Sequence, residues 1–186
     1  SKYNIFCFGP GRDDMDENVV ESLVKFTFTG GNEYDVGAVI VGVDTFFNYL
    51  KILKAMTYLQ NKDCLFLATN TDETYSTGAG TQFPDSGPMV AAISVVSGRE
   101  PYILGKPGAH LIDVLRSKHD PERTLFVGDR LNTDILIGNR CSFKTVLVVS
   151  GIHKLKDVDR YKTSEKTEDR MSIPDYYTDT FSDLVL

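Results

Sequence analysis

The fold of this chain is decided by the stretch Leu125-Phe126-Val127-Gly128-Asp129-Arg130-Leu131-Asn132-Thr133-Asp134, in which a short apolar segment runs into two acidic residues. We expect the apolar segment to be a strand that places Asp129 at its tip, with Gly128 leaving room for a close approach. Asp134 is expected to begin a helix. Two carboxylates that face one cavity suit a hard cation with oxygen ligands, Mg²⁺ above all. A helix cap beside a surface loop explains the same residues, so both interpretations stay open at this point.

Strand and helix patterns alternate along the chain. The run Val36–Val43 is continuously apolar and rich in valine, which is typical of a strand buried on both faces. Apolar residues at spacings of three and four then predict an amphipathic helix over Thr45–Gln60, with Thr45 as its N-cap. Further strands are predicted over Cys64–Ala68, Thr124–Val127 and Lys144–Val149, and further helices from Ser86 onward, over His110–Lys118 and over Asp134–Asn139. This alternation predicts parallel βαβ units and therefore an α/β fold.

The remaining segments have weaker patterns. Residues Thr69–Ser86 are polar and rich in glycine and are predicted to form a loop. Residues His153–Arg170 are highly charged and are predicted to be a solvated excursion from the fold. Shorter elements are predicted as a strand over Tyr3–Phe8, a helix over Val19–Phe28, an edge strand at Pro174-Asp175-Tyr176-Tyr177 and a terminal helical turn over Phe181–Leu186.

Composition and charge exclude several classes of protein. The 186 residues are 41% hydrophobic and 25% charged, which is ordinary for a globular chain and excludes a low-complexity or disordered one. The formal net charge of −6 gives no global electrostatic attraction to nucleic acid or to an anionic membrane. No apolar run approaches the ~20 residues that a membrane-spanning helix needs. The first residues, Ser1 to Phe6, do not resemble a signal peptide.

The cysteines and histidines indicate no metal or redox site. Cys7, Cys64 and Cys141 are widely spaced and stand beside apolar neighbours, so we expect reduced, buried thiols in a reducing compartment, the cytoplasm. The three histidines, His110, His119 and His153, show no spacing typical of a zinc site, and we expect them to be surface or structural residues.

A second charged feature lies upstream, at Gly105-Lys106-Pro107. A lysine between glycine and proline after a short strand is held in a tight turn, where its ammonium group could neutralise a phosphate or hold a carboxylate. An ordinary exposed lysine in a turn is the alternative. Together, Lys106, Asp129 and Asp134 supply a cation, a metal ligand and a second carboxylate, which are the groups that phosphoryl transfer uses.

These two motifs, Gly105-Lys106-Pro107 and Val127 to Ile135, resemble motifs three and four of the haloacid dehalogenase-like phosphatases. More narrowly, they are similar to the nitrophenylphosphatase branch, which includes phosphoglycolate phosphatase and pyridoxal phosphate phosphatase. Supporting stretches are Val41-Gly42-Val43-Asp44 with Phe47, Ala68-Thr69-Asn70-Thr71-Asp72, and Pro174-Asp175-Tyr176-Tyr177.

The resemblance implies an Mg²⁺-dependent phosphatase that acts on a small phosphorylated metabolite through a phosphoaspartyl intermediate. It implies that Lys106 holds the nucleophile and the transferring phosphoryl group, that Asp129 binds Mg²⁺, and that Asp134 supports the metal loop. Asn70 is implied as a substrate-binding residue. Residues 1–101 would form an α/β cap domain, and residues 102–186 the carboxyl-terminal half of a Rossmann-like core with a parallel sheet.

Two features depart from the family's pattern. The family's nucleophile is the first aspartate of an Asp-x-Asp-Gly motif, but Asp14-Met15-Asp16 and Asp157-Val158-Asp159 neither follow an apolar strand nor precede the required glycine. We therefore expect this polypeptide to lack the first half of the core, to be marginally stable or oligomeric, and to have no turnover by itself. The alternative is a non-catalytic binding module, a homodimer that pairs through the cap at Val36–Val43.

The second departure is Phe46, which stands where close relatives often have a histidine, two residues after the aspartate of Gly-x-Asp. Phe46 is either a core residue in the first turn of the following helix or an aromatic residue that faces the substrate. The second interpretation leaves the identity of the substrate open.

Overall fold

The computed structural model describes residues 36–76 and 81–184. They divide into two compact units. The first comprises the residues up to Glu73 together with Pro84–Tyr102, and the second comprises Thr74–Phe83 and the residues from Ile103 onward. Several predictions lie outside the described residues: the elements over Tyr3–Phe8 and Val19–Phe28, Cys7, and the Asp14-Met15-Asp16 motif.

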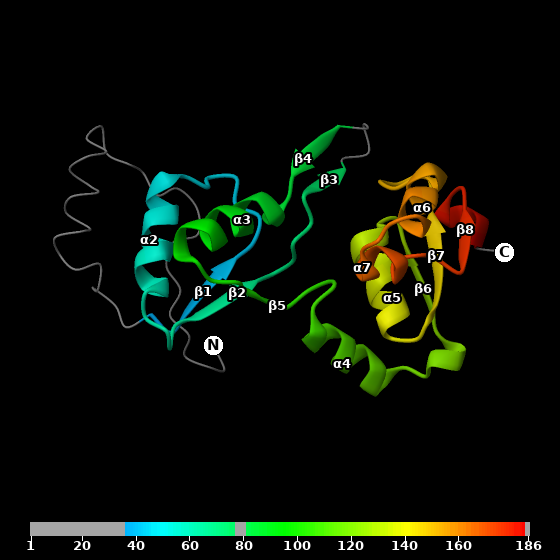
Figure 1. Ribbon diagram of the computed structural model, residues 1–186, viewed down its shortest axis with the longest axis horizontal. Helices are drawn as coiled ribbons and strands as arrows, with labels where there is room; N and C mark the ends of the chain where they lie inside the picture. The colour runs from blue at the N-terminus through cyan, green and yellow to red at the C-terminus, as the bar shows by residue number, and fades with distance from the viewer. Residues whose placement is uncertain (1–35, 77–80, 185–186) are drawn as a thin grey trace. The chain divides into compact units, whose positions relative to one another are not determined.

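The first unit is built on parallel strands with two helices packed against them (Figure 1). Its sheet has the order β1-β2-β5, and Ala38 of β1 lies opposite Leu65 of β2. Apolar side chains from both helices and both long strands form its core, because each element buries one apolar face. The elements are β1 (Ala38–Val41), α2 (Tyr49–Leu59), β2 (Leu65–Ala68), α3 (Ser86–Ser97) and β5 (Tyr102–Ile103).

Helix α2 begins later than the sequence predicts. The predicted N-cap was Thr45, but the side chain of Asn48 accepts a hydrogen bond of 3.1 Å from the amide of Lys51 and caps the helix there. The residues before it form a turn, in which the Asp44 carboxylate accepts a hydrogen bond of 2.8 Å from the amide of Phe46. A short polar side chain that binds the backbone two residues ahead favours a turn over a helix, so the prediction for Thr45 is wrong.

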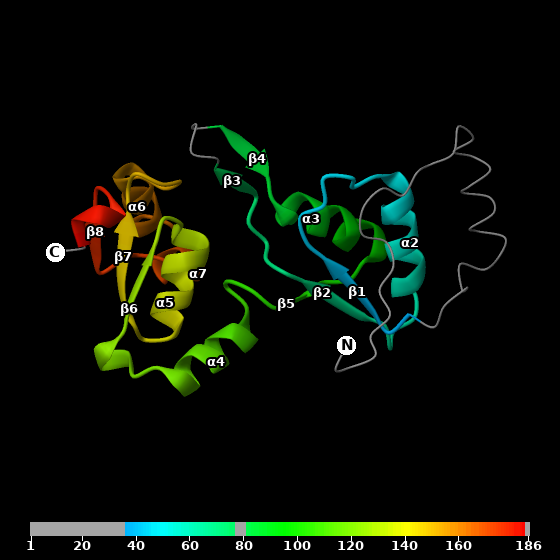
Figure 2. The same ribbon diagram turned by 180° about the vertical axis from the view of Figure 1, so that it is seen from behind.

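The second unit contains a three-stranded parallel sheet in the order β6-β7-β8 (Figure 2). Strand β7 is central, and β6 is an edge strand among the described residues, with the Leu125 side chain half exposed. The predicted α/β fold with parallel sheets is therefore confirmed. The elements are α4 (Ala109–Lys118), a 3₁₀ turn (Pro121–Arg123), β6 (Leu125–Gly128), a π-helical turn (Leu131–Ile135), α5 (Leu136–Arg140), β7 (Lys144–Val148), α6 (Leu155–Lys162), α7 (Thr167–Arg170), β8 (Tyr176–Thr178) and a 3₁₀ turn (Phe181–Leu184).

Three further predictions are corrected in this unit. The predicted loop over Thr69–Ser86 contains a hairpin of β3 (Thr74–Ser76) and β4 (Gln82–Pro84), in which the rings of Tyr75 and Phe83 stack with centroids 5.8 Å apart. The charged segment His153–Arg170 forms helices α6 and α7, because Val158 and Tyr161 are buried in the core. Asp134 lies within a π-helical turn and does not begin a regular α-helix.

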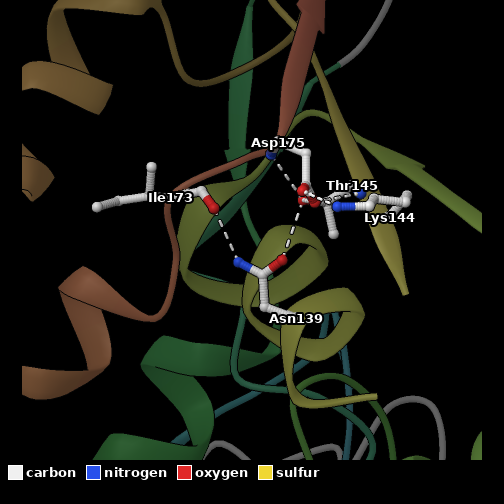
Figure 3. A network of polar contacts seen from close by, with 5 residues as sticks. All are labelled: Asn139, Lys144, Thr145, Ile173 and Asp175. Atoms are coloured by element: carbon white, nitrogen blue, oxygen red, sulfur yellow. Dashed lines mark hydrogen bonds and ion pairs between the residues drawn. The ribbon is translucent and has the colours of Figure 1, made fainter. Parts of the chain in front are cut away.

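A polar network fixes the amino-terminal end of β8 against β7 (Figure 3). The Asp175 carboxylate accepts hydrogen bonds from the Lys144 ammonium group at 2.7 Å and from the Thr145 amide at 3.0 Å. The Thr145 hydroxyl donates to Asn139 Oδ1 at 3.0 Å, and Asn139 Nδ2 donates to the Ile173 carbonyl at 2.8 Å. The hydrogen bond from Lys144 is the main reason that the pKa of Asp175 lies below its usual value.

This lowered pKa gives a prediction for the pH dependence of stability. A carboxyl group with a depressed folded-state pKa stabilises the fold above its unfolded-state pKa, about 3.9, and this contribution is lost as the pH falls through the folded-state value. The Lys144 side chain is 64% exposed, so solvent screens the pair. Asp175→Asn is expected to lower the free energy of unfolding by no more than about 1 kcal/mol at pH 7, and this difference should shrink below about pH 4. Urea unfolding of both proteins across this pH range measures it. Asp179→Asn, at an exposed position, is the control, and a difference that stays constant with pH would contradict the prediction.

In the part of the chain that the structure describes, none of the helices has the length and apolar character needed to cross a membrane.

Candidate active site

Lys106 and Asp134 form an ion pair at the carboxyl end of β6. Lys106 Nζ lies 2.5 Å from Asp134 Oδ1; the Asp134 side chain is 7% exposed and that of Lys106 is 39% exposed. The ammonium group is therefore held on a buried carboxylate while part of the lysine side chain remains open to solvent. A cation held in this way can meet an anionic ligand without first being reorganised.

The turn around Lys106 is tightly closed. The Gly108 amide donates to the Gly105 carbonyl at 2.6 Å, and a β-carbon on Gly108 would overlap the Ile103 carbonyl. The Pro107 carbonyl accepts a hydrogen bond of 3.3 Å from Arg140 Nη1 on α5. These contacts close the turn and require glycine at position 108, and they hold the backbone on both sides of Lys106.

The second oxygen of Asp134 organises the loop that contains Asp129. Asp134 Oδ2 accepts hydrogen bonds from the amide of Asp129 at 3.2 Å and from that of Arg130 at 3.1 Å. A β-carbon at position 128 would overlap the Asp134 side chain, so this approach requires Gly128. The Asp134 carboxylate therefore binds two loop amides and Lys106 together, and the interpretation of Asp129 and Asp134 as an Mg²⁺ site stays a prediction.

Asp129 lies against the loop that follows β7. Its Oδ2 accepts a hydrogen bond of 3.0 Å from the Ile152 amide, and a β-carbon on Gly151 would overlap its carboxylate. Among the described residues, its Oδ1 accepts no hydrogen bond, which leaves one hard oxygen donor for a ligand. The described residues contain no group of three or more acidic, histidine or cysteine side chains able to hold a metal ion. Asp129 can therefore contribute one oxygen ligand to a cation whose other ligands these residues do not provide.

Sequence reasoning missed two residues of this site. His153 Nδ1 accepts a hydrogen bond of 3.0 Å from the Leu131 amide, and its own amide donates to the Asp129 carbonyl at 3.0 Å. The expectation of a structural histidine is correct for His153, but no local pattern indicated that it supports the Asp129 loop. The second residue is Arg130, whose side chain is almost fully buried at 7% exposure.

The predicted site residues Phe46 and Asn70 belong to the first unit. Phe46 is 46% exposed and precedes α2, whereas Phe47 packs against the core, so the interpretation of Phe46 as a first-turn core residue is wrong. Asn70 Nδ2 donates to Asp85 Oδ1 at 3.3 Å, close to the start of α3. A substrate contact of either residue stays a prediction.

Asp44, the aspartate of Gly-x-Asp, also lies in the first unit. Its carboxylate pairs with the Lys51 ammonium group. Burial raises the pKa of this carboxyl group, but the hydrogen bonds from Lys51 and from the Phe46 amide outweigh that effect and leave the pKa below its usual value. Asp44 is therefore engaged in fixing the turn before α2.

Comparison with known proteins identifies the family. Residues 103–184, which include Lys106, Asp129 and Asp134, match the model of the HAD-hydrolase-like family. Over 155 residues the chain is 40% identical to glycerol-3-phosphate phosphatase from Rattus norvegicus, an alignment that covers 82% of this chain and 48% of the relative. The chain belongs to the HAD-like hydrolases. The resemblance stated from its motifs is confirmed.

Solved structures of two phosphatases share the fold over most of this chain. The 4-nitrophenylphosphatase from Thermotoga maritima aligns with a TM-score of 0.64 at 29% identity, covering 82% of this chain and 56% of that one. A glycerol phosphate phosphatase from Mycobacterium tuberculosis, solved in complex with magnesium, aligns with a TM-score of 0.61 at 27% identity, covering 78% of this chain and 42% of that one. This HAD-like hydrolase chain spans about half the length of the relatives it matches.

Proposed function

We propose that the full-length protein that contains this chain is an Mg²⁺-dependent phosphatase of small phosphomonoesters, such as glycerol 3-phosphate, phosphoglycolate, pyridoxal phosphate or nitrophenyl phosphate. The observation that supports this most directly is the arrangement of Lys106, Asp134 and Asp129 at the carboxyl end of β6, where open parallel sheets bind their ligands. The names of two relatives, a glycerol-3-phosphate phosphatase and a 4-nitrophenylphosphatase, agree with this class of substrate.

Lys106 would bind the phosphoryl group. Its ammonium group sits 2.5 Å from Asp134, so the buried carboxylate sets its position, and its partial exposure leaves donors for a phosphate oxygen. A fixed cation stabilises the negative charge that develops on the transferring group. Asp134 acts on the reaction by holding Lys106 and the amides of the Asp129 loop.

Asp129 would be the ligand for Mg²⁺. Its Oδ1 accepts no hydrogen bond among the described residues, and a carboxylate oxygen suits this cation. When bound, Mg²⁺ neutralises charge on the phosphate and orients it. The resemblance places the nucleophilic aspartate, which would form the phosphoaspartyl intermediate, in a motif that none of the 186 residues matches.

We assign residues 1–101 to a cap domain and residues 102–186 to the carboxyl-terminal half of the core. The boundary between the two compact units, after Tyr102, supports this division, although the hairpin Thr74–Phe83 belongs to the second unit. The exposed edge of β6, with Leu125 50% exposed, is a position where a further core strand could pair.

A cytoplasmic location is part of the proposal. Cys64 and Cys141 are free and buried, and burial raises the pKa of both thiols. Free thiols are typical of proteins in reducing compartments.

The test is hydrolysis of nitrophenyl phosphate and glycerol 3-phosphate by the purified full-length protein. We expect activity with Mg²⁺, its loss with a chelator and its return when Mg²⁺ is added again. The isolated 186-residue chain is expected to be inactive with either substrate. Absence of Mg²⁺-dependent hydrolysis by the full-length protein would reject the proposal. Robust hydrolysis by the isolated chain would show that the nucleophile is one of the 186 residues and would reject its assignment to another part of the protein.

Pairing of two copies through the first unit is a second candidate function. Ile40 on β1 and Leu65 on β2 are 63% and 58% exposed, which is unusual for large apolar side chains in a sheet. Light scattering on the full-length protein would show a dimer that Ile40→Asp converts to a monomer. A monomer at all concentrations would exclude this candidate.

A further inference from the structure

Arg130, the residue after Asp129, has a buried charged side chain whose role the site described above does not explain. Its side chain is 7% exposed, and a guanidinium group stays charged at any physiological pH. Burial of such a group is costly unless its N–H groups are hydrogen-bonded. Arg130 Nη2 donates to the Thr74 carbonyl and lies 3.3 Å from the Thr74 hydroxyl, within the second unit.

The contact with Thr74 extends to both strands of the β3–β4 hairpin. Thr74 is the first residue of β3, and its hydroxyl donates to Gln82 Oε1 on β4 at 3.3 Å while it accepts from Arg130. The Thr74 hydroxyl thus accepts from Arg130 and donates to Gln82, so one chain of hydrogen bonds joins Arg130 to both strands. The stacked rings of Tyr75 and Phe83 hold the same two strands together.

The main chain of Arg130 is fixed at both of its polar groups. Its amide donates to Asp134 Oδ2 at 3.1 Å, and its carbonyl accepts from the Ile135 amide at 3.0 Å. The backbone of Arg130 cannot shift without breaking these bonds. A displacement of the guanidinium group therefore strains the loop that contains Asp129 and that is bonded to Asp134.

We propose that Arg130 is a positioning residue that couples the β3–β4 hairpin to the Asp129 loop. The guanidinium group holds the hairpin at Thr74, whose hydroxyl binds Gln82, and the order of the Asp129 loop depends in turn on this contact. The coupling between the hairpin and the loop does not require that the protein is an enzyme. Its effect on phosphate binding rests on the proposed function.

Amide hydrogen exchange on the full-length protein tests the coupling from both ends. Arg130→Met is expected to raise exchange of the β3 and β4 amides by about tenfold, since a charged hydrogen bond is lost. Thr74→Val, a change on the hairpin, is expected to raise exchange of the Asp129 and Arg130 amides by about threefold. Thr74→Ser keeps the hydroxyl and should match the wild type.

The outcomes separate this proposal from the proposed function. If Thr74→Val leaves exchange of the Asp129 and Arg130 amides unchanged, or if Thr74→Ser has the same effect as Thr74→Val, the coupling is refuted, whether or not the protein hydrolyses phosphomonoesters. If exchange in the variants changes as expected but the wild-type protein has no phosphatase activity, the coupling stands and the proposed function fails. Thr74→Val removes the hydroxyl that joins Arg130 to Gln82, so the test does not depend on the folding of Arg130→Met.

Discussion

If the full-length protein is the proposed phosphatase, replacing Lys106 by methionine is expected to lower its kcat by about 100- to 1,000-fold, the usual effect of removing one fixed charge-stabilising donor. Methionine keeps most of the length of the side chain but removes the ammonium group. The effect should fall on catalysis more than on stability, because the Asp134 carboxylate keeps its hydrogen bonds from the Asp129 and Arg130 amides when the ammonium group is removed. Steady-state hydrolysis of nitrophenyl phosphate with Mg²⁺ measures the loss.

Lys118→Met is the matched control for this experiment. Lys118 is exposed at the last turn of α4, in the same unit as Lys106 but outside the candidate site. Its replacement should leave kcat unchanged. If Lys106→Met retained near-wild-type kcat in a correctly folded protein, the assignment of Lys106 to the phosphoryl group would be wrong.

Much of the local structure around the site could be predicted because it depends on short patterns. The apolar run before Asp129 forms β6, and Lys144–Val148 forms β7 beside it in parallel register. The carboxyl ends of parallel strands meet at one edge of a sheet, so the sequence also indicated where the charged residues would gather.

The partners of these residues could not be predicted from the same patterns. Periodicity describes one element at a time, whereas Lys106 and Asp134 are 28 positions apart and Asp129 and Ile152 are 23 apart. The bond between Arg130 and Thr74 joins positions 56 apart. Which loops meet is determined by the packing of the whole unit.

The errors in helix boundaries have local causes. Thr45 and Asn48 are both good N-cap residues, and the turn that Asp44 forms with the Phe46 amide favours the later start. Helix α6 was not predicted because most of its residues are charged or polar. Its apolar pattern consists of only two residues, Val158 and Tyr161, which are three positions apart and both buried.

Replacing Asp134 by alanine is expected to lower the free energy of unfolding by about 3 kcal/mol. The side chain is 7% exposed, and its loss would leave the amides of Asp129 and Arg130, together with the Lys106 ammonium group, without their carboxylate. Asp134→Asn should cost less, because the single amide oxygen can still accept from the two backbone amides while its NH₂ group faces Lys106. Denaturant unfolding of the full-length variants measures both changes.

Asp113→Ala provides the control, since Asp113 is an exposed aspartate on α4, and its replacement should change stability by less than about 0.5 kcal/mol. The pair of variants at positions 106 and 134 then separates two roles. Lys106→Met should reduce activity with little loss of stability, whereas Asp134→Ala should reduce both, because one carboxylate positions the lysine and the Asp129 loop. If Asp134→Ala were as stable as Asp113→Ala, the loop would have to be held by its other contacts, the bonds of His153 to Leu131 and Asp129.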